Sequence, residues 1–572
     1  MSDCQVHDAD KLSLRSQRLG PLPIINHFLD RIGLEGILAR YVPTNDKRTR
    51  LRYEIAIGVL LRSILVEREP IYRQQQTVNS YAPQAFGLSV QSASCVGDDA
   101  IGRALDRLFD ADRGTILTEV VVATSRAFDL SLTELHNDST SIKFCGQYKA
   151  ATGRSIRGKR APFITRGYSK DHRPDLKQLL FILTTTRDGA VPVQFRSEDG
   201  NRNDSRTHEQ TWDSLCKATG RQDFLYVADS KLCNGQALDY LHSNGGRFVC
   251  VMPRSRAEDR QFRKWVQTHQ PQWQLVYDKP NARRKYAARD KWWVFRYPIP
   301  SVEGWPTVWV FSSLLRTRQD NARRERLSAA TEAFDALNKK LSGPRPRKRS
   351  RQQLQHMLDL ILKRYKVSRY IKLGIVADEH PFFRQDGPGR PSVSTRYVKK
   401  TLHRWRVQWV IDQDAVEYDR KSDGMYPLLT NDRTLSDKQV LDAHKRQPTI
   451  EKRFEQTKTV FELAPVLLKN EGRVQALFFI YFLSLLVQAV IERQLRLAMK
   501  REGIEQLPLY PEERAASHPT AEQIFRLFGL AQRHVLICDR HEIRVFEHEL
   551  TQLQQQVLSL LGVSNDCFRR NA

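Results

Sequence analysis

The sequence contains no pattern typical of a structural zinc site or a disulfide framework. Its eight cysteines are scattered over 572 residues, and they form neither a CxxC pair nor a metal-ligand spacing with histidine. Disulfides are rare in a reducing compartment, and this cysteine usage fits one. We therefore expect a protein of the cytosol that holds neither zinc nor disulfides.

The sequence also lacks a signal peptide and an apolar run long enough to cross a membrane. Its opening stretch, MSDCQVHDADKLSLRSQ, is polar. The most apolar segment, ALFFIYFLSLLVQAVI, covers the 16 residues Ala476–Ile491 and includes Gln488. A membrane-spanning helix needs about 20 predominantly apolar residues. We expect this segment to be a buried core helix, and we expect no membrane partner.

Acidic residues are in deficit. Lys and Arg number 92 and Asp and Glu 65, so the net charge is 92 − 65 = +27. Such an excess indicates a polyanionic partner. Nucleic acid is the partner we favour, and an anionic membrane surface is the alternative. Hydrophobic residues make up 40% of the chain, which is enough for several domains with sizeable cores.

Residues 1–130 read as an all-α domain. In DDAIGRALDRLFD, the apolar side chains of Ile101, Leu105 and Leu108 follow helical spacing. Arg103 and Arg107 lie one turn apart on another face of this helix. Such a basic face fits a DNA groove, although a solvent-exposed face of an ordinary bundle has the same spacing. We expect residues 1–130 to form a helical DNA-binding domain.

After residue 130 the pattern changes to α/β. LTELHNDSTSIKF, LKQLLFILTTT and VPVQFRSEDGN read as strands, the last two joined by the turn RDGA, and DFLYVADS and RFVCVMPRS read as further strands. This order predicts a mixed α/β sheet over residues 131–255. Strand patterning resumes at GMYPLLTN. We therefore expect 256–420 to be a mainly β insertion, 421–500 the second part of the core, and 501–572 a helical tail.

Two aspartates are candidates for a functional role because of where they lie in the predicted strands. Asp138 lies on the mostly apolar face of LTELHNDSTSIKF, together with Ile142 and Phe144. Burying an unpaired carboxylate is costly. Asp229 ends the apolar strand DFLYVADS, and ligands of open α/β sheets gather beyond the carboxyl ends of strands. Taken alone, either aspartate is more often a cap or turn residue.

The third acidic candidate lies in HKRQPTIEKRFEQTK. Four polar residues of this segment stand at offsets 0, 3, 7 and 14: His444, Gln447, Glu451 and Lys458. These offsets place them on one face of a helix. A neighbouring apolar stripe includes Ile450, so Glu451 would lie at the edge of a core. Without further signals, a solvent-facing glutamate has the same spacing.

Together, these motifs resemble those of DDE transposases of bacterial insertion sequences, specifically the cut-and-paste group with a large insertion between the second and third acidic residues. HNDST is similar to the first-strand motif and VADS to the second-strand motif. HKRQPTIEKRFEQTK is similar to the helix signature, in which Tyr, Arg, Glu and Lys occupy the four offsets. His444 and Gln447 depart from the usual Tyr and Arg, and Arg446 and Lys452 lie close enough in sequence to substitute.

The resemblance covers most of the chain and implies a ribonuclease H-like core with Asp138, Asp229 and Glu451 as catalytic and metal-binding triad. The separations, 229 − 138 = 91 and 451 − 229 = 222, match the wide second gap of the group. Three converging carboxylates raise one another's pKa, and a divalent cation reverses that cost. Oxygen ligands suit Mg²⁺, with Mn²⁺ as a substitute. Two such ions clamp an in-line displacement at phosphorus.

The resemblance also implies the partners and the location. These are double-stranded DNA, as terminal inverted repeats and as target, and a second copy in a homodimeric synaptic complex in the bacterial cytoplasm, associated with the nucleoid. The residues expected to contact DNA are polar or basic: Lys458, Gln447, His444, Arg446, Lys452, Arg103 and Arg107.

Three functions remain open on the sequence. The first is a transposase that binds insertion-sequence ends and catalyses metal-dependent cleavage and strand transfer. The second is a metal-dependent ribonuclease H-like nuclease without a joining step. The third is a DNA-binding protein without catalysis that uses only its basic charge. Joining of the cleaved DNA ends distinguishes the transposase from the nuclease. Dependence of the activity on metal distinguishes both enzymes from the non-catalytic DNA-binding protein.

Overall fold

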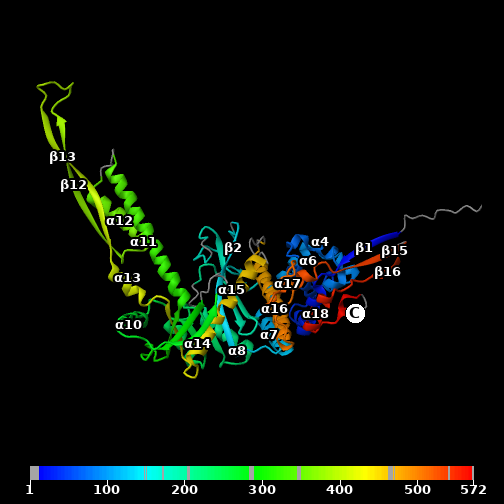
Figure 1. Cartoon of the computed structure of the whole chain (residues 1–572). Helices are drawn as coiled ribbons and strands as arrows, with labels where there is room; N and C mark the ends of the chain where they lie inside the picture. Colours follow the sequence, from blue (N-terminus) through cyan, green and yellow to red (C-terminus); the bar gives the residue numbers. More distant parts are fainter. Residues whose placement is uncertain are drawn as a thin grey trace, which may run out of the picture. The chain divides into compact units, whose positions relative to one another are not determined.

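The computed structural model describes most of the chain: residues 12–146, 148–149, 151–170, 173–202, 207–281, 289–343, 349–460, 468, 470–538 and 541–569. The chain divides into two compact units (Figure 1). The first consists of Met1–Cys250, Thr430–Asp432 and Asp442–Ala572, and the second of Val251–Leu429 and Arg433–Leu441. Each unit is described by itself below.

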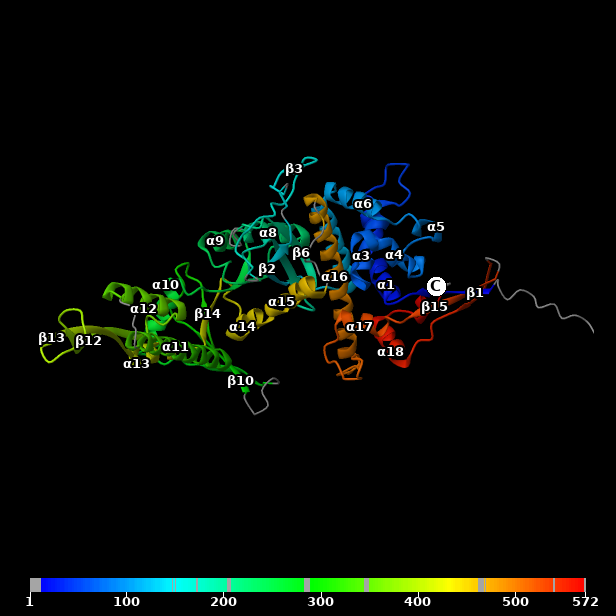
Figure 2. The ribbon, with the colours of Figure 1, turned by 90° about the horizontal axis from the view of Figure 1, so that it is seen from above.

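The first unit is built around one long apolar helix, α16 (Glu471–Arg501). The N-terminal helices α3 (Tyr53–Val66) and α6 (Asp98–Asp110) pack against it, as Figure 2 shows. Among the described residues, α16 is the one helix long and apolar enough to span a membrane, but 89% of its most apolar 18-residue window is buried. The prediction of a buried core helix in this segment is confirmed.

Further helices complete the first unit. They are α1 (Leu22–Ile32), α2 (Leu34–Tyr41), α4 (Gln74–Asn79), α5 (Val90–Ala93), α7 (Arg113–Phe128), α8 (His208–Thr219), α9 (Gly235–Ser243), α15 (Pro448–Glu455), α17 (Ala521–Leu527) and α18 (Gln552–Leu561). Helix α14 (Asp437–Arg446) precedes α15 along the chain.

The sheet of the first unit mixes parallel and antiparallel strands, as the sequence predicts. Its five strands follow in the order β6 (Pro192–Glu198), β5 (Lys177–Thr186), β2 (Glu134–Phe144), β7 (Leu225–Ala228) and β8 (Arg247–Val251). β2 is antiparallel to β5 and parallel to β7, and β7 is parallel to β8. β5 and β6 form the predicted hairpin. The central β2 is buried along most of its length.

A second, three-stranded sheet corrects two predictions for this unit. β1 (Leu12–Arg18) pairs antiparallel with β15 (Gln532–Cys538), which pairs with β16 (His541–Phe546). The N-terminal part is therefore not all-α, and the C-terminal part is not a helical tail. β1 is mostly exposed and shows no local apolar pattern, because its partner lies more than 500 residues away along the chain.

The second unit combines a sheet with long helices. Four antiparallel strands follow in the order β14 (Met425–Thr430), β11 (Thr307–Ser312), β10 (Arg289–Arg296) and β9 (Gln274–Pro280). Helix α10 (Ala257–Trp265) stacks Phe262 on Trp309, with ring centroids 3.6 Å apart.

The remaining elements of this unit are α11 (Ser313–Ser342), α12 (Arg351–Tyr365), β12 (Ile371–Gln385), β13 (Tyr397–Ile411) and α13 (Gln413–Arg420). The prediction of a mainly β insertion is wrong, since α11 alone has 30 residues. The sequence obscures this helix because it is largely polar and buries only a narrow stripe that includes Leu327, Phe334 and Leu341.

Candidate active site

Asp138 and Asp229 occupy equivalent positions on neighbouring parallel strands. β2 and β7 pair in register, with Glu134 opposite Leu225 and His136 opposite Val227. Continuing this register by two residues sets Asp138 beside Asp229, which directly follows the last residue of β7. Backbones of paired strands lie roughly 5 Å apart. The topology thus brings together two aspartates that are 91 residues apart in sequence.

Asp138 has a perturbed carboxyl group. Burial raises its pKa to about 6, and the charges of Asp229 and Glu451 add to the rise. Two partners act in the opposite direction: the backbone N–H of Ser139 donates to Asp138 Oδ1 at 2.7 Å, and Lys170 Nζ lies 4.0 Å from the same oxygen. The charges of carboxylates on two other segments, Asp229 and Glu451, therefore act on Asp138.

Glu451 reaches this region on α15, which packs against β2 and β5. The helix is held from its buried side by Arg453, which donates to the carbonyl oxygens of Gly189 and Ala190 at 2.7 and 3.0 Å and to Glu492 at 2.9 Å. Glu451 itself is exposed. The buried anchor thus leaves the Glu451 carboxylate accessible to a ligand.

The helix that carries the predicted signature is interrupted twice. α14 ends at Arg446 and α15 begins at Pro448, because proline has no N–H to continue the helix and is favoured at a first turn. After α15, residues Gln456–Val460 form a π-helix, which has more residues per turn. His444, Gln447, Glu451 and Lys458 therefore do not lie on one continuous α-helix, and their shared face stays a prediction.

Gln447 lies at the first interruption and joins it to β2. Its side-chain Nε2 donates to the carbonyl oxygen of Asn137 at 2.8 Å, and its Oε1 lies 3.1 Å from Nδ1 of His136. Asn137 directly precedes Asp138. The side chain expected to contact DNA thus has internal partners that fix the start of the Glu451 helix against β2.

Arg446 has an internal partner as well. Its guanidinium donates twice to Glu134, at 2.6 and 2.8 Å, and His136 Nε2 contacts the same carboxylate at 2.9 Å. Although burial alone would raise the pKa of Glu134, hydrogen bonds with His136 and Arg446 lower it to about 2. This network ties the end of α14 to the beginning of β2.

The other residues expected to contact DNA are distributed over two places. His444 is half-buried, and burial lowers its pKa to about 4, so its ring is neutral at pH 7. Lys452 is exposed and Lys458 is half-buried. Arg103 and Arg107 are exposed on α6, and Arg107 lies 5.9 Å from the ring centre of Tyr53.

Lys170 is a site residue that the sequence did not reveal. Its Nζ donates to the carbonyl oxygen of Ser139 at 2.6 Å and to Ser139 Oγ at 2.7 Å, in addition to its approach to Asp138. It belongs to the loop between β2 and β5, 32 residues after Asp138. A lone lysine in a polar loop carries no periodic signal, so only the folded arrangement shows this contact.

The donor set fits a hard divalent cation in chemistry but is not assembled as a ligand sphere. Carboxylate oxygens are the preferred ligands of Mg²⁺ and Mn²⁺, and the mutual repulsion at Asp138 is what a cation relieves. Within the described ranges, no group of three or more His, Cys, Asp or Glu side chains is arranged to hold a metal ion. The fit therefore rests on the identity and charge of the donors.

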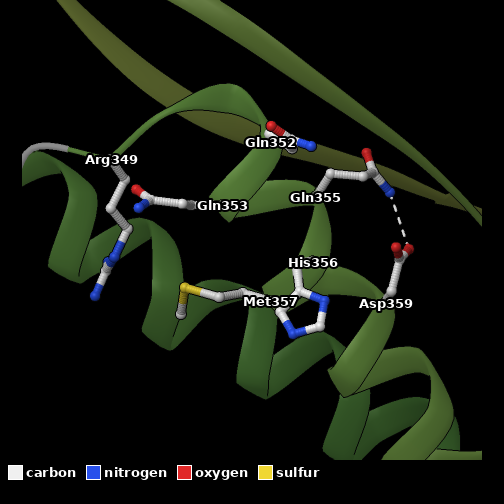
Figure 3. Close-up of a pocket in the computed structure, with 7 residues that line it drawn as sticks. All are labelled: Arg349, Gln352, Gln353, Gln355, His356, Met357 and Asp359. Atoms are coloured by element: carbon white, nitrogen blue, oxygen red, sulfur yellow. Dashed lines mark hydrogen bonds between the residues drawn. The ribbon is translucent and has the colours of Figure 1, made fainter.

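The second unit contains a pocket whose lining differs from the acidic residues around Asp138. It lies along α12 and is lined by amide, basic and sulfur-containing side chains, with Gln355 donating to Asp359 at 2.9 Å (Figure 3). None of the expected site residues lines it. Its lining offers one carboxylate and no nucleophile beside a base, so it does not present a second catalytic site.

Comparisons with known proteins find similarity among solved structures. No model of a protein family matches the sequence, and no curated protein matches it. Among solved structures, a piggyBac transposase synaptic complex with hairpin DNA matches with a TM-score of 0.26 and 12% identity. The match covers 53% of this chain and 63% of that chain. Similarity at this level does not establish a shared fold or activity.

Proposed function

We propose that this protein is a DDE-type transposase that binds the ends of an insertion sequence and catalyses metal-dependent cleavage and strand transfer. Asp138, Asp229 and Glu451 are its catalytic residues. The observation that carries the proposal is the coupling of these carboxylates: the strand register sets Asp138 beside Asp229, and the charges of both Asp229 and Glu451 raise the pKa of Asp138. Carboxylates brought together in this way are typical of functional sites.

The proposed fold is ribonuclease H-like. It is supported by the order of three antiparallel strands followed by two parallel strands, with the two aspartates on the central pair. The hairpin β5–β6 and the Arg453 anchor then give the Glu451 helix its place against the same sheet. In this architecture, residues far apart in sequence would act on one phosphate.

Asp138, Asp229 and Glu451 would hold two Mg²⁺ ions, with Mn²⁺ as a substitute. Bound there, the metal supplies a Lewis acid that activates water or a 3′-hydroxyl and stabilises charge on the phosphate. Gln447 fixes the Glu451 helix to the Asp138 strand, and Lys170 orients the backbone and side chain of Ser139 next to Asp138. The protein residues thus position the carboxylates for in-line displacement.

The proposed substrates are double-stranded DNA ends and target DNA, and the proposed active form is a homodimer. The net charge of +27 supports a polyanionic partner. Neutral His444 and the internally bonded Gln447 contribute less to phosphate binding than the resemblance implies. Lys452 and Lys458 lie close to Glu451 in sequence.

The test uses purified full-length protein and a supercoiled plasmid that carries the DNA flanking both sides of its gene. Incubation with Mg²⁺, Mn²⁺ or EDTA is followed by sequencing of nicked, excised and joined products. The proposal predicts metal-dependent cleavage at fixed positions and joining of the freed 3′ ends to target DNA.

The two alternative functions give different products in the same assay. Metal-dependent cleavage without any joined product indicates a nuclease and overturns strand transfer. Binding without cleavage in either metal indicates a non-catalytic DNA-binding protein and overturns the catalytic proposal.

A further inference from the structure

The second unit carries a long two-stranded ribbon that is packed on one face. β12 and β13 pair antiparallel over 15 residues each, from Ile371 opposite Ile411 to Gln385 opposite Tyr397. At a rise of about 3.3 Å per residue, each strand is roughly 50 Å long. Figure 1 shows this ribbon reaching beyond the ends of α11 and α12. An isolated hairpin is marginally stable in water, so its base must be anchored.

The base of the ribbon is fixed to α11 and α12. The side chain of Asn338 donates to the carbonyl oxygen of Val407 and accepts from its N–H, both at 2.8 Å. Trp405 Nε1 donates to the carbonyl oxygen of Arg349 at 3.0 Å, and Trp409 packs on Phe334 with ring centroids 5.4 Å apart. These contacts hold one face of the ribbon, whereas most side chains of the opposite face whose burial is described are exposed.

The exposed face is basic along its length. Because side chains alternate between faces, the register places a second set of residues opposite the packed face, of which these have described burial: Lys372, Gly374, Val376, Asp378, Phe382, Arg384, Val398, Lys400, Arg404, Arg406, Gln408 and Val410. Five of these are Lys or Arg and one is acidic. Within the described part of the chain, Arg384 and Lys400 form no ion pair, whereas Arg406 pairs with Asp378 at 3.3 Å.

The outer half of the ribbon also exposes aromatic side chains beside these charges. Phe382 is 42% exposed, and its cross-strand neighbour is Lys400. Phe383, on the other face, is 68% exposed opposite Lys399. Residues 376–406 contain seven Lys or Arg against three Asp or Glu, 7 − 3 = +4. A purely apolar tip would favour a protein partner, but a basic one favours a polyanion.

We propose that the exposed face of the β12–β13 ribbon binds duplex DNA, with Arg384 and Lys400 on backbone phosphates and Phe382 against the groove. A major groove about 12 Å wide admits a two-stranded β-ribbon. Contacts to phosphate position a protein on the duplex without reading its sequence. The inference rests on the proposed function for its substrate, but it concerns binding and is independent of the catalytic carboxylates.

The test compares two variants of the full-length protein with the same change in charge. Arg384→Gln/Lys400→Gln removes two cations from the ribbon. Arg260→Gln/Lys264→Gln removes two exposed cations, again one Arg and one Lys, from α10 of the same unit. Binding of a fluorescent duplex is measured in EDTA over a series of salt concentrations, so that neither cleavage nor metal binding enters the result. Circular dichroism checks that both variants are folded.

The ribbon variant is expected to lower the slope of log binding constant against log salt by about 1.8, at about 0.9 for each lost phosphate contact. The α10 variant is expected to keep the wild-type slope. Equal slopes for wild type and ribbon variant overturn the inference while leaving the proposed function intact. A ribbon variant that changes only the oligomeric state, measured by light scattering, assigns the face to a second copy and also overturns it. A wild type that binds no duplex at all overturns the proposed function together with the inference.

Discussion

The side-chain amide of Gln447 donates to the carbonyl oxygen of Asn137 at 2.8 Å, one residue before Asp138. Since Gln447 lies between α14 and α15, this single bond connects the helix of Glu451 to the strand of Asp138. The contact of its Oε1 with His136 adds a second point on the same strand. The position of Glu451 relative to Asp138 therefore depends on a glutamine at a place where the helix signature that the sequence resembles has arginine.

Replacing Gln447 by Ala or Arg is expected to destabilise the protein and to reduce cleavage. Either change removes the acceptor that faces His136, and arginine also adds a cation beside Arg446. The loss of a hydrogen bond between partly buried groups costs roughly 1–2 kcal/mol. Urea unfolding at pH 7.5 measures the change, with Lys452→Ala, on the exposed side of α15, as a control. A Gln447→Arg variant with wild-type stability and higher activity would show that this side chain contacts DNA instead.

Stability should fall with rising pH because of Asp138. The pKa of Asp138 in the folded protein is about 6, above the ordinary value of 3.8. Its contribution to the free energy of unfolding is therefore fully present below pH 4 and is lost as the pH rises through 6. Asparagine cannot ionise, so the Asp138→Asn variant does not lose this stability as the pH rises. In the absence of metal, the variant should be more stable than wild type at pH 7.5, by up to about 3 kcal/mol.

The measurement is chemical denaturation in EDTA between pH 4 and pH 8. The advantage of Asp138→Asn should disappear near pH 4. Asp239→Asn, an exposed aspartate on α9, serves as the control and should change stability little at any pH. A wild type that is equally or more stable than Asp138→Asn at pH 7.5 would contradict the account of this carboxyl.

Glu134 is expected to have the opposite pH dependence. Hydrogen bonds with His136 and Arg446 outweigh the effect of burial and lower the pKa of Glu134 from 4.5 to about 2. Its contribution to the free energy of unfolding is therefore present above pH 4.5 and is lost as the pH falls towards 2. Glu134→Gln should cost up to about 3 kcal/mol at pH 7 and much less at pH 3. Thermal unfolding at the two pH values tests this, and an equal cost at both would exclude the ionic network as its source.

Much of the first unit's sheet could be predicted from the sequence, because the signals are local. β5, β7 and β8 are apolar runs, and β2 alternates around Asp138. The pairing of β1 with β15 could not be predicted, since neither segment carries information about a partner so distant in the chain. The polar helix α11 was obscured because its buried stripe is narrow.

The triad could be proposed from three short motifs, but the supporting residues could not. Lys170 contacts Ser139 and Asp138 from a loop without any repeating pattern. Pro448 is typical of a helix start and indicates the break at Gln447. The π-helix that carries Lys458 has no comparable signal in its sequence.

Lys458 is expected to bind a phosphate near the scissile one. Lys458→Ala should lower the salt slope for binding of cleavage-ready ends by about 0.9, which corresponds to one phosphate contact, and should leave metal affinity unchanged. Lys500→Ala, at the exposed end of α16, removes the same charge elsewhere and should keep the slope. An unchanged slope and unchanged cleavage in Lys458→Ala would remove this lysine from the DNA-binding residues.

The central claim is that Asp138, Asp229 and Glu451 act together on metal and DNA. Asp138→Asn, Asp229→Asn and Glu451→Gln each remove one charge at nearly constant volume, and Asp239→Asn is the matched control. The most direct measurement is single-turnover cleavage of bound end DNA in Mg²⁺, with DNA binding measured in parallel in EDTA. The account predicts that each of the three variants binds DNA as wild type does but cleaves at least 100-fold more slowly (roughly 3 kcal/mol in the barrier), while the control cleaves normally. Wild-type cleavage by any one of the three variants would contradict the claim for that residue and leave the site without its triad.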